Sequence, residues 1–258
     1  MTALVVAATL RLAIYYGYPT LVNGAAGDLD RAAEAFARYD VVVFGDGLEL
    51  DPADAPDAAS KRERAALSDL VARIRRLRPD VEIYGYVDLG SSQQLRSGEI
   101  AWRIDRWQAA RATGIFFDEA GADFGVTPAR RQAAVAAAHA RRLRVFMNAF
   151  NPDDLFADDG RVDAAARLGD DDALLLESLV VRHGVREPAD VTARRIVRAL
   201  RWKERRRVRV FGVATAADDP MPSGLIDQCR AIAAERGLDG FGIGEPAFSA
   251  ASALLTTR

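Results

Sequence analysis

Acidic and amide side chains recur in this sequence directly after short apolar runs, at intervals of about 30 residues. The clearest case is the pair Asp118-Glu119, which follows Gly-Ile-Phe-Phe; Asn148 follows Val-Phe-Met and Glu177 follows three leucines. Placing charged groups against apolar runs is costly unless the groups are solvated or used. Glycoside hydrolysis uses a pair of carboxyl groups, one as acid/base and one as nucleophile or base. We therefore take Asp118, Glu119 and Glu177 as the candidate catalytic residues.

The other apolar runs also end in side chains that suit a sugar. Aromatic faces pack against sugar rings, and carboxylates and amides bind hydroxyl groups. Each has a structural alternative, because a strand-end Asp can cap the next helix and a tyrosine can belong to the core. The candidate substrate-binding residues are Tyr15, Tyr16, Asp46, Tyr86, Asp88, Asn148 and Glu245.

The runs that carry these residues have the length and composition of buried parallel strands, being short and rich in β-branched or aromatic residues. The eight predicted strands are Leu10–Gly17, Val41–Phe44, Val81–Val87, Gly114–Phe117, Val145–Met147, Ala173–Leu176, Val208–Val213 and Gly240–Ile243. The predicted helices between them are Leu29–Tyr39, Ser60–Leu77, Ile100–Arg111, Pro128–Arg141, Ala189–Arg205 and Ser223–Arg236.

A strand and a helix repeated at this spacing predict a (β/α)8 TIM barrel, formed as a single domain by residues 1–258. The segment Asn151–Gly169 is acidic and only weakly helical. The rival fold is an open, doubly wound sheet, which is disfavoured because Tyr15–Pro19 stands where a glycine-rich phosphate loop is expected. In TIM-barrel enzymes the active site lies at the C-terminal ends of the strands, so the candidate residues should converge there.

Neighbouring residues of a strand point to opposite faces, which constrains the acid pair. Asp118 and Glu119 both face the barrel mouth only if the strand bends there, as Gly121 would allow. Otherwise one acid is catalytic and the other binds sugar or supports a neighbouring segment.

Composition narrows the possible partners. The 258 residues include 35 basic and 37 acidic side chains, a net charge of −2 that gives no pull toward nucleic acid or an anionic membrane. No apolar run reaches 18 residues, and Cys229 is alone, so no internal disulfide forms. The first residues lack the basic start of a signal peptide, which predicts a cytoplasmic protein. The oligomeric state is not indicated.

We expect neither a cofactor nor a metal ion. Both lysines, Lys61 and Lys203, fall in predicted helices, which argues against a Schiff base. The histidines, His139 and His183, are far apart and predicted at the surface, which argues against a histidine-rich metal site. The alternative is an all-carboxylate Mg²⁺ site formed by Asp46, Asp88, Asp118 and Glu177.

The third and fourth predicted strands resemble those of a known family, the spherulin 4-like proteins and the related polygalactosaminidase-type glycoside hydrolases. The resemblance is carried by Gly85-Tyr86-Val87, Arg103–Trp107, Gly114–Glu119 and, more loosely, the first-strand segment Tyr15–Pro19. It implies a (β/α)8 barrel that cuts galactosamine-containing polysaccharides. The family's Asp-Glu pair would map onto Asp118 and Glu119, and its later strand-end glutamate onto Glu177. One departure is Phe44–Glu49, which replaces the family's Asn-Pro loop after the second strand.

Three hypotheses follow. The first is a metal-independent hydrolase that acts on an amino-sugar polysaccharide. The second, motivated by the altered loop after the second strand, is a barrel that binds a glycan or a protein without cutting it. The third is a barrel enzyme for a sugar phosphate, motivated by the glycines at 242 and 244 near the end of the eighth strand.

Overall fold

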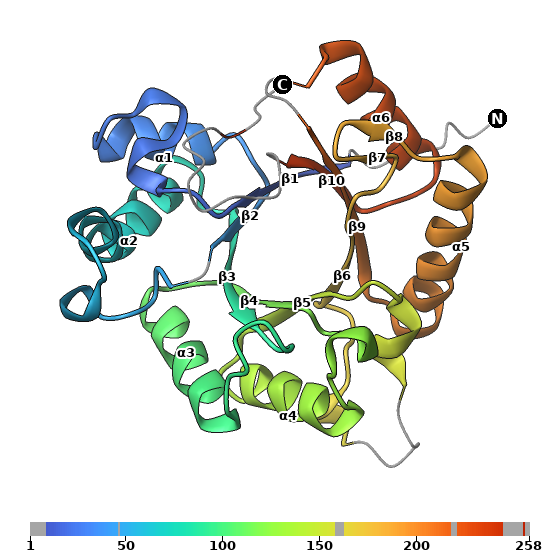
Figure 1. Cartoon of the computed structure of the whole chain (residues 1–258), viewed down its shortest axis with the longest axis horizontal. Coiled ribbons are helices and arrows are strands. Elements are labelled where there is room, and N and C mark those ends of the chain that lie inside the picture. The colour runs from blue at the N-terminus through green and yellow to red at the C-terminus, as the bar shows by residue number, and fades with distance from the viewer. Residues whose placement is uncertain (1–8, 46, 158–162, 218–220, 245–254, 256–258) are drawn as a thin grey trace.

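Eight parallel strands close into a barrel in the computed structural model, which describes residues 9–45, 47–157, 163–217, 221–244 and 255. Around the ring the strands pair in the order β1-β10-β9-β6-β5-β4-β3-β2, and β2 and β10 both pair with β1 (Figure 1). The predicted (β/α)8 barrel is therefore confirmed. The strands are β1 Leu10–Tyr15, β2 Val41–Phe44, β3 Glu82–Asp88, β4 Gly114–Asp118, β5 Arg144–Asn148, β6 Ala173–Leu176, β9 Arg209–Thr215 and β10 Gly240–Gly244.

The helices form a ring outside the strands (Figure 1). Capping side chains explain several starts: Asp28, Asp57 and Thr127 each accept a hydrogen bond from a backbone N–H of the first turn. In the described part of the chain, no helix is long and apolar enough to cross a membrane. The α-helices are α1 Leu29–Phe36, α2 Ala58–Leu77, α3 Ser97–Ala109, α4 Pro128–His139, α5 Ala189–Arg206 and α6 Ser223–Glu235. The short 3₁₀ turns are η1 Pro19–Gly24, η2 Pro52–Asp54 and η3 Ala122–Phe124.

The segment between β5 and β6 has no α-helix among its described residues. It contains the 3₁₀ turns η4 Pro152–Phe156 and η5 Ala164–Ala166, which accords with its weakly helical sequence. Phe156 of this segment stacks on Trp202 of α5, with ring centroids 4.2 Å apart. This contact ties the segment to the neighbouring helix and covers the barrel where a helix is missing.

Alternation along the strands separates two cores. One apolar cluster fills the barrel interior and includes Leu12, Ile14, Val43, Tyr84, Tyr86, Phe116, Phe146, Leu175, Phe211 and Val213. The residues between them, such as Ile115 and Phe117 of β4, belong to a larger cluster with the helices. Because side chains alternate with a period of two, Asp118 continues the inward row of Phe116.

A helix side chain packs directly on the backbone of β3 at Gly85. A Cβ at this position would lie 1.9 Å from the indole of Trp107, which donates a hydrogen bond from Nε1 to the main-chain oxygen of Tyr86 at 3.0 Å. The glycine and tryptophan of the family-like motif thus serve the packing of α3 on β3.

We expect Gly85→Ala to lower the free energy of unfolding by about 2 kcal/mol, because the added methyl forces Trp107 out of its place. Gly98→Ala in α3 is the matched control: nothing lies within 4 Å of its added Cβ, and alanine favours a helix. Urea unfolding of both variants checks this expectation. Equal stabilities of the two variants would contradict it.

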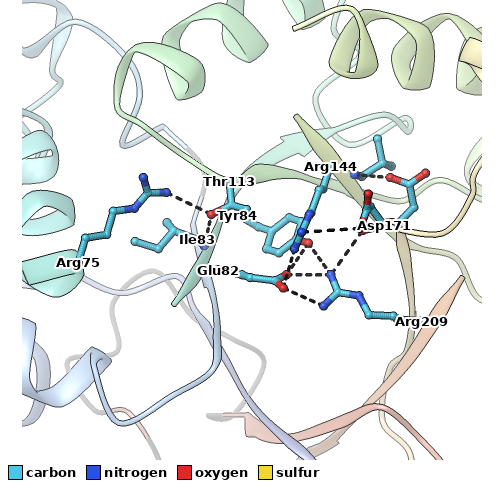
Figure 2. A network of polar contacts seen from close by, with 10 residues as sticks. Arg75, Glu82, Ile83, Tyr84, Thr113, Arg144, Asp171 and Arg209 are labelled. Carbon is cyan, nitrogen blue, oxygen red and sulfur yellow. Dashed lines mark hydrogen bonds and ion pairs between the residues drawn. The ribbon is translucent and has the colours of Figure 1, made fainter. Parts of the chain in front are cut away.

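Charged residues close the N-terminal end of the barrel (Figure 2). Glu82 of β3 accepts hydrogen bonds from both Nη atoms of Arg209, at 2.9 and 2.8 Å, and from Arg144 at 2.7 Å. The Tyr84 hydroxyl donates to the same carboxylate at 2.9 Å and accepts from Arg209 at 3.0 Å. Burial opposes ionisation of Glu82, but Arg209 and Arg144 outweigh it and hold the pKa of this carboxyl below its usual value.

Candidate active site

Three predicted polar residues come together at the C-terminal end of the barrel. Asp118 ends β4, Asn148 ends β5 and Glu177 directly follows β6, and these strands are neighbours in the ring. Each residue is two positions beyond an inward-facing residue, respectively Phe116, Phe146 and Leu175. The parity of the strands therefore turns all three side chains toward one opening.

One amide holds the two carboxyl groups together. The Asn148 Nδ2 atom donates to Asp118 Oδ1 and to Glu177 Oε2, at 2.8 Å in each case. Since both oxygens lie 2.8 Å from one nitrogen, they are at most twice that distance, about 5.6 Å, apart. The bound applies to one oxygen of each acid, and it favours the closely spaced carboxyl groups of retaining glycosidases, roughly 5–5.5 Å apart, over the roughly 6.5–9.5 Å of inverting ones.

The two carboxyl groups differ in their surroundings. Burial and the neighbouring Glu177 carboxylate raise the pKa of Asp118 from 3.8 to about 6, against the opposing hydrogen bonds from Asn148, the Glu119 N–H and Tyr86. Glu177 is exposed to the pocket. The raised pKa lets Asp118 keep its proton closer to neutral pH than an ordinary aspartic acid does, which is the property of a general acid.

We expect Asp118→Asn to stabilise the protein at pH 8. A carboxyl whose pKa is raised on folding stabilises the fold below its unfolded pKa, and this contribution is lost as pH rises through about 6. Asparagine does not titrate and has nearly the same shape as aspartic acid. The free energy of unfolding of the variant, measured relative to wild type, should therefore be higher at pH 8 than at pH 4 by on the order of 2 kcal/mol. Urea unfolding of both proteins at the two pH values measures the difference. A stability difference that does not change with pH would contradict the expectation.

Glu119 lines the same pocket as Asp118, but its carboxylate is bound by Ser92. Its backbone is left-handed, with φ of 50°, and its carboxylate accepts hydrogen bonds from the Ser92 N–H at 3.1 Å and from the Ser92 hydroxyl. A Cβ on Gly90 would lie 2.3 Å from Glu119 Oε2. The Asp118 carboxylate thus contacts Asn148, whereas the Glu119 carboxylate holds the segment between β3 and α3; which of the two acids is catalytic stays a prediction.

The tyrosines of the first strand lie on opposite sides of the barrel wall. Tyr16 packs edge-on against Tyr86 inside the mouth, with centroids 5.2 Å apart. Tyr15 is only 1% exposed and packs against Phe36 of α1, so the prediction that it contacts substrate is wrong. The reason is the strand register, which turns neighbouring residues to opposite faces.

The remaining predicted binding residues are less accessible or not described. Asp88 ends β3 and pairs in register with Asp118, but it is only 1% exposed and is not a surface contact for a sugar. Asp46 and Glu245 lie outside the described residues. Within the described part of the chain, no group of three or more His, Cys, Asp and Glu side chains is arranged to hold a metal ion.

The glycines of β10 have a packing explanation. A Cβ on Gly242 would lie 2.5 Å from the main-chain oxygen of Leu12 in the adjacent strand β1. The close approach of these two strands is enough to require glycine at position 242, and a phosphate-binding role is not needed to explain it.

A pocket of about 360 Å³ opens above the two carboxyl groups. Besides the predicted acids and Asn148, it is lined by residues that the sequence analysis missed: Phe124, Ala149, Phe150, Ser178, Arg182, His183 and Arg195. Phe150 is 70% exposed and presents an aromatic face at the rim. His183 was predicted as a surface residue and is exposed, but it lies in this pocket. The other histidine, His139, is half-buried and contacts Asp172 at 3.1 Å.

A small hairpin places two of these residues. Strands β7 Val181–Arg182 and β8 Val185–Arg186 pair antiparallel around His183-Gly184, and both turn residues have positive φ, 48° and 75°. This is the geometry of a two-residue type I′ turn. The Thr215 hydroxyl and carbonyl at the end of β9 accept hydrogen bonds from the N–H groups of His183 and Gly184, at 2.9 and 2.8 Å.

Several residues at this pocket have unfavourable backbone conformations. Besides Glu119 and His183, the lining residue Ser178 and the adjacent Val180 have positive φ, 49° and 70°. Such a conformation is costly for a β-branched residue such as Val180 and persists only where the surroundings impose it. Backbone strain of this kind concentrates at functional sites, so it supports the assignment of the pocket as the site.

Comparison with known proteins finds similarity to solved structures and none to family models or curated sequences. No model of a protein family and no curated protein sequence matches the chain. The glycoside hydrolase domain of PelA from Pseudomonas aeruginosa is similar, with a TM-score of 0.55, 14% identity and coverage of 92% of this chain and 95% of that one. The carboxyl transferase domain of Rhizobium etli pyruvate carboxylase gives a TM-score of 0.56 and 10% identity, over 92% of this chain and 40% of that one. The chain thus has the TIM-barrel fold of a glycoside hydrolase domain, a fold that it shares with an enzyme of unrelated chemistry.

Proposed function

We propose that the protein is a glycoside hydrolase that cleaves an amino-sugar polysaccharide of the galactosamine type with retention of configuration. One observation carries the proposal: two inward carboxyl groups, Asp118 and Glu177, share the Asn148 amide beneath an open pocket. The resemblance to spherulin 4-like and polygalactosaminidase-type proteins, and the fold shared with a glycoside hydrolase domain, support the choice of substrate class.

The roles follow from the surroundings of the two acids. Asp118, with its raised pKa, donates a proton to the glycosidic oxygen while the Glu177 carboxylate attacks the anomeric carbon. The leaving sugar departs as an alcohol, and a glycosyl ester on Glu177 remains. Asp118, now a carboxylate, takes a proton from water as the water oxygen attacks the same carbon, which frees Glu177.

Other pocket residues position the reacting groups. Asn148 contacts both acids and fixes their separation. The exposed ring of Phe150 offers a face for a sugar ring at the rim, and Tyr86, which packs against Tyr16, forms a side-chain hydrogen bond with Asp118.

A screen of galactosamine and glucosamine oligomers, acetylated and deacetylated, tests the proposal. We expect reducing-end products from a galactosamine oligomer, and NMR of the first product should show the same anomer as the substrate linkage. Saccharide binding without any product after long incubation would identify a binding protein and end the hydrolase proposal. An inverted first product would end the assignment of Glu177 as nucleophile.

A further inference from the structure

The pocket above the two acids carries both signs of charge on different elements. Asp118 lies at the end of β4, with Glu177 after β6. Arg182 and His183 come from the hairpin β7–β8, and Arg195 comes from α5. We call Arg182, His183 and Arg195 the basic side of the pocket. A polymer of galactosamine alone is neutral or cationic, so it has no anionic group that could pair with them.

Two arginines of the basic side have different roles. Arg195 is half-buried and donates to the main-chain oxygens of Ser178, at 3.1 Å, and Glu177, which fixes the segment after β6. Arg182 is exposed, and among the described residues its side chain makes no hydrogen bond or ion pair. Arg182 also lies close enough to act on Arg195, whose pKa is lowered by burial first and by this like charge in addition. The guanidinium of Arg182 is therefore the group available to a ligand.

The chemistry of the pocket favours a carboxylate as that ligand. A guanidinium presents a planar fork that matches a carboxylate with two parallel hydrogen bonds. A phosphate carries about twice the charge, and Asp118 and Glu177 in the same pocket repel it correspondingly more. A uronic acid is a sugar that carries one such carboxylate on a ring of the same size as that of an amino sugar.

We propose that Arg182 binds the carboxylate of a uronic acid joined to the amino sugar at Asp118 and Glu177. The substrate class is then a glycan that combines an amino sugar with an acidic sugar. The proposal rests on the function proposed above and defines its substrate more closely. The hairpin is well suited to this role, because its turn is held to Thr215 of β9 and keeps Arg182 at the pocket.

The test measures binding in the absence of cleavage. The Asp118→Asn protein is titrated by calorimetry with an unsulfated chondroitin hexasaccharide, which alternates N-acetylgalactosamine with glucuronic acid, and with its methyl ester. We expect the acid to bind about tenfold more tightly than the ester. Adding Arg182→Gln should remove this difference. Adding Arg186→Gln, a change on the same hairpin outside the pocket, should preserve it; Arg186 contacts Gln228.

The two proposals fail in distinguishable ways. Equal affinity for acid and ester, no binding of either, or no effect of Arg182→Gln overturns the uronic acid site. Wild-type protein incubated with the same hexasaccharide reports cleavage separately. Charge-dependent binding without any cleavage keeps the site and counts against the hydrolase, whereas cleavage without charge-dependent binding keeps the hydrolase and rejects the site.

Discussion

Asp118→Asn and Glu177→Gln are each expected to lower kcat/KM on the cleaved glycan by about 10³-fold. Asparagine cannot donate the proton that the leaving oxygen needs, and glutamine cannot form the glycosyl ester. Both changes keep the size of the side chain and the contact with Asn148, so the fold should remain. Initial rates on a purified oligomer, together with circular dichroism of each variant, measure the effect.

Glu119→Gln is the discriminating comparison, because it is adjacent to Asp118 in sequence but contacts Ser92. We expect it to lower the rate less than tenfold. A loss as large as that of Asp118→Asn would instead assign catalysis to Glu119. The pH profile gives a second readout: since Asp118 must be protonated in the free enzyme, wild-type kcat/KM should fall as pH rises above about 6.

Glu82→Gln is expected to lower the free energy of unfolding by about 2 kcal/mol, without touching the pocket. The change leaves Arg209 and Arg144 facing a neutral amide at the closed end of the barrel (Figure 2). Breaking a buried ion pair costs about 3–5 kcal/mol, and the partial exposure of these side chains, 18% for Glu82 and 20% for Arg209, reduces that figure. Urea unfolding at pH 7 checks the value.

The pH dependence of this loss has a defined sign. Because the pKa of Glu82 is held below its usual value, its contribution is present above the unfolded pKa and is lost as pH falls through the folded one. The stability difference between wild type and Glu82→Gln should therefore shrink toward acid pH. Glu34→Gln, an exposed change on α1, should alter stability by less than about 0.5 kcal/mol. A comparable loss in both variants would contradict the special role of Glu82.

The fold could be predicted because its signal is local and repeated. Each strand is a short apolar run buried on both faces, and six of the intervening segments have helical periodicity. Strand ends are also the places where a barrel gathers its polar residues, so Asp118, Asn148 and Glu177 could be named together. Their separation depends on the pairing of β4, β5 and β6, which no single segment encodes.

The errors have a common physical cause. Both faces of β1 are apolar, so its sequence does not say which of Tyr15 and Tyr16 points inward. The same ambiguity left the contacts of Asp118 and Glu119 open until the register was known. The hairpin had a usable signal, since His183-Gly184 lies between valine-arginine pairs as a two-residue turn between strands does. Glu82 and Arg209 are 127 positions apart, so no local sequence pattern indicates that they are in contact.

The charged cluster at the N-terminal end of the barrel limits the route by which a ligand can reach the pocket. Between Glu82 with its arginines and the acids at the top, the interior is packed with aromatic and aliphatic side chains, so no chain can thread through. A ligand that reaches Asp118 must enter and leave by the C-terminal end of the barrel. Substrate and products of the proposed hydrolase would therefore share this single opening.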